Sequence, residues 1–215
     1  MDSSYILQSA GYILKGCILT LEIYAITALF SVPLAVLLAL GKVSKNKVLR
    51  NALGVYAWIF RGTPLLLQLF FFYYGLTIFG ISLSPMTAAG LTFVLNYAAY
   101  LMEIFRAGIE SIEKGQYEAA KALNMNYWQT MRRIILPQTV KRVLPPTCNE
   151  AIILVKDTAL VTVIGMGDLL RAAKEIFTRD FTVVPFVIAA VVYLLMTSVI
   201  VSLFRKLERK SSFYL

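Results

Sequence analysis

Several polar and charged side chains of this sequence stand inside long apolar stretches, where an unused polar group would be costly. Within residues 86–107, Asn96, Tyr100 and Glu103 are spaced by four and three residues, so they share one face of a helix. An amide, a phenol and a carboxylate together suit the ammonium group of a zwitterion, and we predict that this face lines a substrate pathway. The alternatives are hydrogen bonds that only fix neighbouring helices, and an ion pair between Glu103 and Arg106.

A second group of such side chains lies further along the chain. Lys156 and Asp157 are adjacent, so they point to different faces of a helix. We predict that Asp157 and Thr158 line the same pathway. Lys156 is instead a candidate to neutralise a buried carboxylate such as Glu103 or Glu150.

A third place is the sequence Arg61-Gly62-Thr63-Pro64, which also stands inside an apolar stretch. Gly62 and Pro64 weaken a helix, and a helix broken here would free backbone amides for a substrate carboxylate, with the Thr63 hydroxyl beside them. We therefore predict a pathway role for Thr63. The alternative is that Pro64 only kinks the helix and that Arg61 extends its charge to the nearest polar surface.

The residue types that are missing exclude several kinds of site. The sequence has no histidine, which removes Ser-His-Asp catalysis and histidine-ligated metal or haem sites. Cys17 and Cys148 are far apart and form no CxxC pair, so we interpret both as small apolar fillers. No GxxxxGK[ST] motif is present. We expect a chain that is not itself an enzyme and that holds no cofactor or metal of its own.

The composition indicates an integral membrane protein. Of 215 residues, 59% are hydrophobic and 15% are charged, and the mean hydropathy is +0.72; a soluble domain carries about 25% charged residues. The apolar runs are continuous rather than alternating, which favours helices over a barrel. We predict an all-α fold with a single transmembrane domain over residues 1–215 and five spanning helices. The predicted spans are about 11–40, 52–79, 86–107, 143–166 and 183–204.

The distribution of Lys and Arg predicts the orientation. Fifteen of them lie after the first span, around the polar stretch 108–142 and in the C-terminal tail, against three on the opposite side. Because positive residues accumulate on the cytoplasmic side, we expect the N-terminus outside and the C-terminus inside. The same rule, rather than nucleic-acid binding, accounts for the net charge of +9. Five helices are few for enclosing a polar pathway, so we expect assembly with a second transmembrane chain.

A short amphipathic run separates the fourth and fifth predicted spans. It extends from Asp168 to Phe177 with apolar residues at helical spacing, and Asp168 is a candidate N-cap. We predict a short helix here. It either lies on the outer membrane surface or forms a docking surface for an external partner, and the sequence leaves both alternatives open.

The stretch 108–142 contains no span, and we predict two short helices in it. Its first part is rich in strong helix formers, and Asn124 then interrupts the helix because Asn enters the left-handed conformation at modest cost. A second helical run is expected to stop at Pro137. Two helices joined at a sharp bend would form a projecting knob, which the small Ala119 and Ala120 would let another surface approach closely. An ordinary helical loop is the alternative.

This stretch resembles the signature of permease subunits of ATP-binding cassette (ABC) importers, which reads Glu-Ala-Ala, three residues, Gly, nine residues, Ile-x-Leu-Pro. Here it stands as Glu118-Ala119-Ala120, Asn124 in place of Gly, and Ile134-Ile135-Leu136-Pro137. The resemblance extends over nearly the whole chain. Three further segments resemble the polar amino acid uptake branch, which includes histidine, glutamine, arginine and cystine permeases. They are residues 61–64, 96–108 and 154–160.

The resemblance implies a type I ABC importer fold in a bacterial plasma membrane. The knob would be a coupling helix-turn-helix that docks in a groove on a cytoplasmic ABC ATPase dimer, which holds ATP and Mg. A second permease chain, as homodimer or heterodimer, and an extracytoplasmic solute-binding protein are implied as further partners. The coupling residues implied are Glu118, Ala119, Ala120, Leu123, Asn124 and Pro137.

We therefore predict a permease subunit that moves polar amino acids into the cell, driven by a separate ATPase. The main alternative is an ion-coupled carrier or channel formed by oligomerisation, in which Glu103 and Asp157 would bind ions. A purely structural membrane anchor for an ATPase is a third alternative, against which the buried polar clusters argue. Which amino acid is carried is not readable from the sequence.

Overall fold

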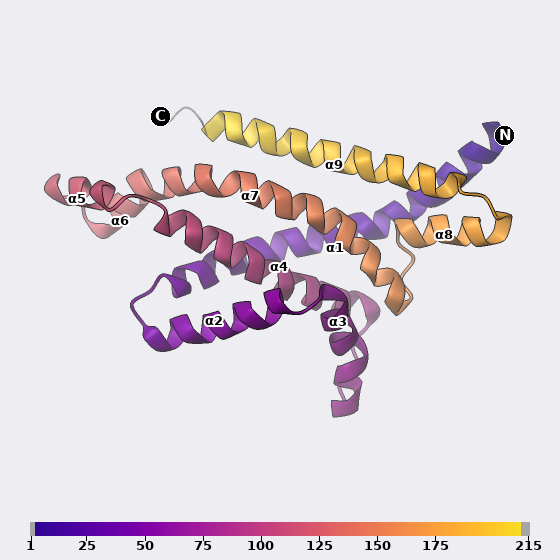
Figure 1. Cartoon of the computed structure of the whole chain (residues 1–215), viewed down its shortest axis with the longest axis horizontal. Coiled ribbons are helices and arrows are strands. Elements are labelled where there is room, and N and C mark those ends of the chain that lie inside the picture. The colour runs from indigo at the N-terminus through magenta and orange to yellow at the C-terminus, as the bar shows by residue number, and fades with distance from the viewer. Residues whose placement is uncertain (1–2, 212–215) are drawn as a thin grey trace.

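The computed structural model describes residues 3–211, and every element within that range is a helix (Figure 1). The long helices are α1 (Ser3–Lys42), α2 (Lys47–Gly62), α4 (Pro85–Glu110), α7 (Leu136–Asp157) and α9 (Val184–Ser211). The shorter elements are α3 (Leu65–Phe70), η1 (Phe71–Gly75), η2 (Leu76–Phe79), α5 (Lys114–Ala122), α6 (Tyr127–Thr130), η3 (Met131–Ile135), η4 (Thr158–Ile164) and α8 (Leu169–Asp180). The predicted all-α class is confirmed.

Helix α1 runs through the bundle and is held there by a stripe of mostly small residues. Its buried positions recur every three or four residues, as one face of a helix requires. They are Ser9, Ile13, Gly16, Thr20, Ile23, Thr27, Ser31, Ala35 and Ala39. Helix α4 packs against this face, where Ala35 and Ala39 meet Ala98 and Met102. Small residues let two backbones approach closely, which is how helices associate where lipid surrounds them.

Helices α7, α8 and α9 complete the bundle. Helix α7 packs against both α4 and α9, and α8 packs against the first part of α1 and the start of α9 (Figure 1). Ile13 of α1, Leu169 and Ile176 of α8 and Ala189 of α9 form one apolar cluster at this end. The amphipathic run after Asp168 is therefore a helix whose apolar face is covered by the rest of the chain.

The second predicted span is broken. Helix α2 ends at Gly62, and the chain bends by 102° before α3, η1 and η2 continue to Phe79. Thr63 is extended, with φ −117° and ψ 148°, and Pro64 has no N–H to donate to α2. The chain therefore turns sharply here, and the alternative of a simple kink at Pro64 is wrong.

Three described helices, α1, α4 and α9, are long and apolar enough to cross a membrane, and α2 with its bent continuation would be a fourth. Helix α7 and η4 cover the remaining predicted span. Helix α7 falls short on hydropathy because polar residues such as Asn149, Glu150 and Lys156 interrupt it. The count of five spans, their orientation and the single domain remain predictions.

The stretch 108–142 folds as the predicted pair of helices around a sharp turn. Helix α5 ends before Asn124, which has a φ of +55° and so adopts the expected left-handed conformation. Asn126 then begins α6 with a reciprocal capping box, since its side chain accepts from the Gln129 N–H while the Gln129 side chain accepts from the Asn126 N–H, both at 2.9 Å. These bonds fix the start of α6 directly after the turn at Asn124.

The predicted helix end at Pro137 is wrong. Elements α6, η3 and α7 follow one another without a break from Tyr127 to Asp157, and Pro137 lies in the first turn of α7. Residues 131–135 form a wider π-helical turn immediately before it. A proline ring inside a regular helix clashes with the carbonyl four residues earlier, and a widened turn relieves that clash.

Candidate functional site

The break in the second span leaves backbone carbonyls at the end of α2 without helical partners, and nearby side chains donate hydrogen bonds to them. The Thr63 hydroxyl donates to the Ile59 carbonyl at 2.7 Å. The Gln68 amide of α3 donates to the carbonyls of Phe60 at 2.9 Å and Thr63 at 3.1 Å, and to the Thr63 hydroxyl at 2.8 Å. Buried carbonyls without partners would be costly in a membrane, so this capping makes the break possible.

Helix α4 contributes two predicted pathway residues to the same capping. The Asn96 amide donates to the Phe60 carbonyl at 2.8 Å and to Gln68 Oε1 at 3.0 Å. One turn later, Tyr100 donates to the Arg61 carbonyl at 3.4 Å, and the Arg61 guanidinium lies 5.4 Å from its ring centre. We call Thr63, Gln68, Asn96 and Tyr100 the hinge network. This is the interhelical bonding named above as the alternative, and a substrate role for Asn96 and Tyr100 stays a prediction.

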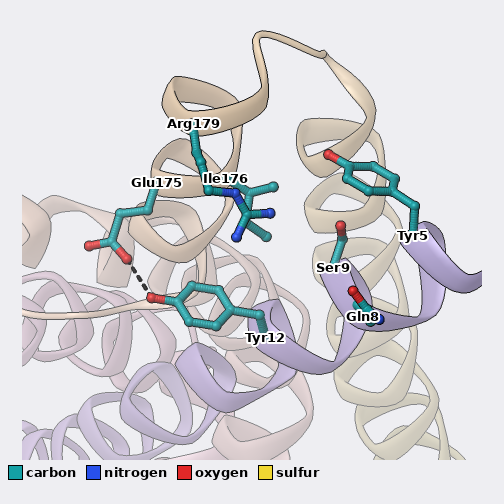
Figure 2. A pocket seen from close by; sticks show the side chains of 7 residues that line it. All are labelled: Tyr5, Gln8, Ser9, Tyr12, Glu175, Ile176 and Arg179. Atoms are coloured by element: carbon teal, nitrogen blue, oxygen red, sulfur yellow. Dashed lines mark hydrogen bonds between the residues drawn. The ribbon is translucent and has the colours of Figure 1, made fainter.

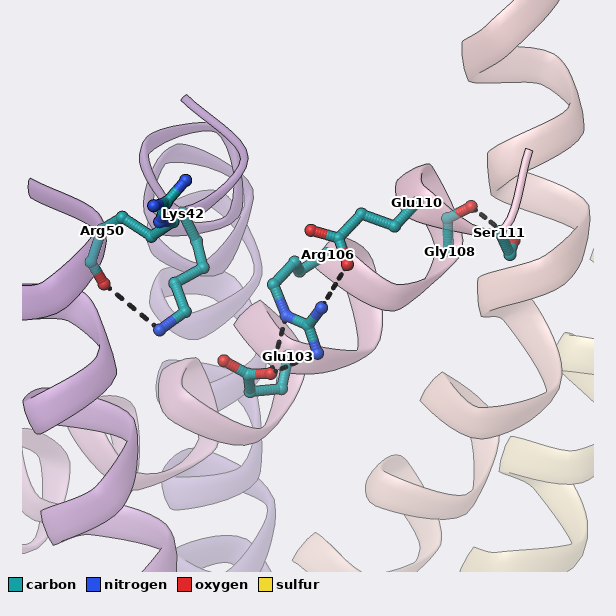
Figure 3. Close-up of polar contacts among 7 residues, drawn as sticks. All are labelled: Lys42, Arg50, Glu103, Arg106, Gly108, Glu110 and Ser111. Atoms are coloured by element: carbon teal, nitrogen blue, oxygen red, sulfur yellow. Dashed lines mark hydrogen bonds and ion pairs between the residues drawn. The ribbon is translucent and has the colours of Figure 1, made fainter. Parts of the chain in front are cut away.

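Glu103, at the end of the same face, is paired with Arg106. The Arg106 guanidinium lies 2.8 Å from the Glu103 carboxylate and also bonds Glu110 (Figure 3). The ion pair that the sequence left open is therefore present, and it makes Lys156 unnecessary as a partner of Glu103. Both contacts of Arg106 are to Glu103 Oε2, so an ammonium group that binds Glu103 would share the carboxylate with Arg106.

The predicted pathway residues at the end of α7 have different surroundings. Asp157 is half-buried and accepts a hydrogen bond from the Tyr97 hydroxyl of α4 at 2.7 Å. Glu150 lies seven residues earlier on the same face and within electrostatic range of Asp157. Thr158, the first residue of η4, is fully buried and donates to the Val155 carbonyl of α7 at 2.7 Å. Of the two predicted pathway residues, Asp157 is therefore the one whose side chain a substrate could reach. Lys156 is exposed on another face of the helix.

A cavity of about 150 Å³ lies beside Glu150, between α1, α4, α7 and α9. Besides Glu150, the polar residues that line it are Tyr24, Ser31, Tyr97 and Thr147, and the rest of the wall is apolar. Sequence reasoning missed Tyr97 and Gln68. Both are polar residues in an apolar stretch that lie close to predicted residues. Tyr97 directly follows Asn96, and Gln68 comes four residues after Pro64.

Helix α7 carries an exposed stripe of mostly polar residues, of which Arg142 also donates to the Ser111 carbonyl. Arg142, Asn149, Ile153 and Lys156 are all exposed, and their spacing of seven, four and three residues places them in one stripe. Two of them, Asn149 and Lys156, stand inside the predicted fourth span. A charge and an amide facing lipid would be unfavourable, so this stripe fits a water-filled path or another polar surface.

Most of the residues implied in coupling lie on the surface of the knob. Glu118, Ala119, Leu123 and Asn124 are exposed. Ala120 is fully buried, so only Ala119 offers the close approach expected of both alanines. This is a correction to the prediction for Ala120, which instead fits tightly inside the knob.

Two aromatic residues that the sequence analysis passed over extend the exposed surface of the knob. Tyr127 is 66% exposed and Trp128 is 78% exposed, and their rings pack edge to face with centres 5.6 Å apart. Exposed Trp and Tyr side chains are the residue types that most often anchor protein interfaces. Pro137, the remaining residue implied in coupling, is half-buried in the first turn of α7 and lies apart from this surface in sequence.

A family model described as "Binding-protein-dependent transport system inner membrane component" matches residues 31–212. The chain belongs to this family. Relatives include the arginine transport system permease protein ArtQ of Bacillus subtilis, 37% identical over 98% of this chain and 97% of the relative. The L-cystine transport system permease protein TcyB of the same organism is 40% identical over 86% and 81%.

Solved structures agree with this membership. A crystal structure of an amino acid ABC transporter with histidines has a TM-score of 0.88 at 35% identity, over 98% of this chain and 99% of the other. The MetNI methionine ABC transporter has a TM-score of 0.70 at 16% identity and so shares the fold. The type I importer fold that the sequence resemblance implied is therefore confirmed.

At the end of the molecule opposite the knob, Asp168 caps helix α8 as predicted. Its carboxylate accepts from the N–H groups of Leu170 and Arg171, each at 3.1 Å, and burial raises the pKa of this carboxyl. The turn lies directly on α1, where a Cβ atom added to Gly16 would be 2.7 Å from the Asp168 carbonyl oxygen. Only glycine allows the two backbones to approach this closely.

A polar pocket of about 330 Å³ lies between α8 and the first turns of α1 (Figure 2). The Tyr12 hydroxyl donates to Glu175 at 2.7 Å, and Arg171 Nε donates to the same carboxylate at 3.0 Å. These bonds hold the pKa of Glu175 below its usual range. Tyr5 makes a similar bond to Asp180 at 2.9 Å, so two tyrosines tie α8 to α1.

Proposed function

We propose that this chain is the permease subunit of an ABC importer that moves polar amino acids into the cell. The exposed knob carries the proposal, because its sequence has the spacing of the importer signature and its surface presents Glu118, Leu123 and Trp128 to a partner. Relatives named for arginine and L-cystine support amino acids as the substrate class. ATP and Mg would be held by two cytoplasmic ATPase subunits, since this chain carries no P-loop motif.

The helix that links the knob to the polar core supports a coupling mechanism. From Tyr127 to Asp157 the chain is helical without a break, which corresponds to about 45 Å. A displacement of the knob by an ATPase would therefore move Glu150 and Asp157 directly. In this proposal, closure of the ATPase dimer drives the permease between inward-open and outward-open states.

The outward stripe of α7 supports assembly with a second permease chain, as homodimer or heterodimer. Asn149 and Lys156 would face the equivalent surface of the partner across a water-filled path, with Arg142 at its end. On the inner face of α7, Asp157 beside Tyr97 and Glu150 beside the internal cavity suit an ammonium group. Thr63, Asn96 and Tyr100 would act by holding the broken helix beside the path.

The pocket and helix α8 support a role at the outer surface. The exposed side of α8 is rich in charge: Arg171 pairs with Glu175 at 3.0 Å, Arg179 pairs with Asp180 at 2.6 Å, and Lys174 lies on the same surface. We propose that an extracytoplasmic solute-binding protein docks here and delivers the amino acid. The protein would then lie in a bacterial plasma membrane with its N-terminus outside, in keeping with the charge distribution.

Uptake of labelled amino acids into proteoliposomes tests the proposal, using the intact complex with its ATPase and binding protein. We expect ATP-dependent uptake, lowered at least tenfold by Asp157→Asn and unchanged by Glu208→Gln, which removes a half-buried carboxylate near the end of α9, outside the predicted spans. Uptake by the permease alone, without nucleotide, would instead establish the ion-coupled carrier or channel.

A further inference from the structure

A cationic groove lies at the base of the knob, where α5 faces the start of α7. It has a volume of about 490 Å³. Its polar lining consists of Gln116, Arg133, Gln138, Lys141 and Arg142. None of the described residues that line it is acidic. We call it the basal groove, and its three cations and two carboxamides suit a ligand that is an anion.

Hydrogen bonds within the chain shape the basal groove but leave most of its charge free. The Gln138 amide donates to Gln116 Oε1 at 3.3 Å and to the Ile134 carbonyl at 3.0 Å, which ties α7 to α5. The Gln116 amide group therefore keeps its N–H donors. Within residues 3–211, neither Arg133 nor Lys141 has a carboxylate within ion-pair distance.

The position of the groove along α7 indicates which anion it meets. Lys141 immediately precedes the hydrocarbon boundary expected near residue 143, and Arg133 lies two helical turns further from it. The headgroup layer on one side of a bilayer is about 5–8 Å thick, so Lys141 lies at the depth of the lipid phosphates. Beside the cations, Leu136 and Val140 are 42% and 44% exposed, an apolar edge that free phosphate would not need.

We propose that the basal groove binds the phosphate headgroup of an anionic phospholipid from the cytoplasmic leaflet. The assignment rests on the orientation in the proposed function. Lys141 would bind the phosphate within the headgroup layer, and the long Arg133 side chain would extend toward the same phosphate from about 12 Å further along the continuous helix of η3 and α7. The Gln116 amide would donate to the phosphate, and the acyl chains would run past Val140 into the bilayer. Because the groove joins α5 to α7, a bound lipid would brace the knob against the helix that it moves.

Native mass spectrometry of the purified permease–ATPase complex, titrated with phosphatidylglycerol or phosphatidylcholine, tests the proposal. Near an anionic membrane each basic residue contributes about fivefold to binding, so we expect Arg133→Gln with Lys141→Gln to weaken phosphatidylglycerol binding about 25-fold. The matched control is Arg132→Gln with Lys114→Gln, which removes the same charge from exposed positions outside the groove. The control should bind phosphatidylglycerol like the wild type.

Three outcomes would overturn the proposal. They are equal weakening in the control, equal binding of both lipids by the wild type, and displacement of the lipid by inorganic phosphate at matched concentration, which would indicate a free-phosphate site. The proposed function is tested separately by uptake. ATP-driven uptake together with an unselective groove would contradict only the lipid assignment, whereas selective lipid binding without uptake in any bilayer would contradict only the import function.

Discussion

Replacing Gln68 with Leu tests whether the hinge network holds the broken span. Gln68 is 7% exposed, and Leu is close to it in size. In the variant, the Thr63 carbonyl loses the Gln68 donor, and the Asn96 amide loses one of its two acceptors. The Phe60 carbonyl keeps its bond from Asn96. One buried amide and one half-buried carbonyl are therefore left without full bonding, and the Leu side chain makes no hydrogen bond to either.

The expected loss of stability follows from those two groups. Each buried group left without a partner costs about 1–3 kcal/mol, so we expect the free energy of unfolding to fall by about 3 kcal/mol. For a chain of this size that corresponds to a Tm lower by about 6–12 °C. Gln8→Leu is the matched control, because Gln8 is an exposed amide on α1, and a change there should stay within about 0.5 kcal/mol.

Thermal unfolding of the purified protein in detergent, followed by circular dichroism, measures both variants. A double-mutant cycle with Asn96→Leu adds a second readout, since residues that share one network couple by about 0.5–3 kcal/mol. If Gln68→Leu unfolds like the Gln8→Leu control, and its effect adds simply to that of Asn96→Leu, the hinge network does not support the break.

Three further predictions concern other parts of the chain. Gly16→Ala should lower the Tm by several degrees, because its Cβ would meet the Asp168 carbonyl oxygen at 2.7 Å, whereas Gly11→Ala, with no atom within 4 Å, should not; equal melting curves would contradict the close contact. Glu118→Lys should uncouple ATP hydrolysis from uptake in proteoliposomes while the protein still reaches the membrane, and unchanged uptake would remove the docking role of the knob. The pKa of Glu175 is lowered in the folded protein, so its ionised carboxylate contributes fully to folding stability above the ordinary pKa of about 4.3, and this stability is lost as the pH falls through the folded-state pKa. Amide hydrogen exchange of α8 should therefore accelerate in that acidic range. An exchange rate that does not change with pH beyond its intrinsic dependence would argue that Glu175 does not tie α8 to α1.

Features that depend on neighbouring backbone were predictable from the sequence. Asn124 was expected in the left-handed conformation because few other residues tolerate it, and its φ is +55°. Asp168 was expected as an N-cap because its carboxylate can reach the first N–H groups of the next helix, which it does. Gly62 and Pro64 indicated where the second span is weak. Each of these signals acts over four residues or fewer.

Features that depend on distant partners were not predictable. Asn96 bonds Gln68 and the Phe60 carbonyl across 28 and 36 residues of sequence, and nothing in the spacing of α4 indicates that those carbonyls will be free. Pro137 was expected to end a helix because its ring clashes in a regular one, but the π-helical turn before it depends on how the knob packs. Ala120 is buried for the same reason.

The polarity of α7 follows from its position between the knob and the proposed path. A spanning helix is recognised by apolar residues, yet one that forms the wall of a polar path must carry polar groups on that wall. Asn149 and Lys156 lie on the outward stripe, and Glu150 lies beside the internal cavity, so these polar groups are spread over two faces. Helix α7 is therefore less apolar than the other predicted spanning helices because it forms the wall of the proposed polar path and connects that path to the coupling knob.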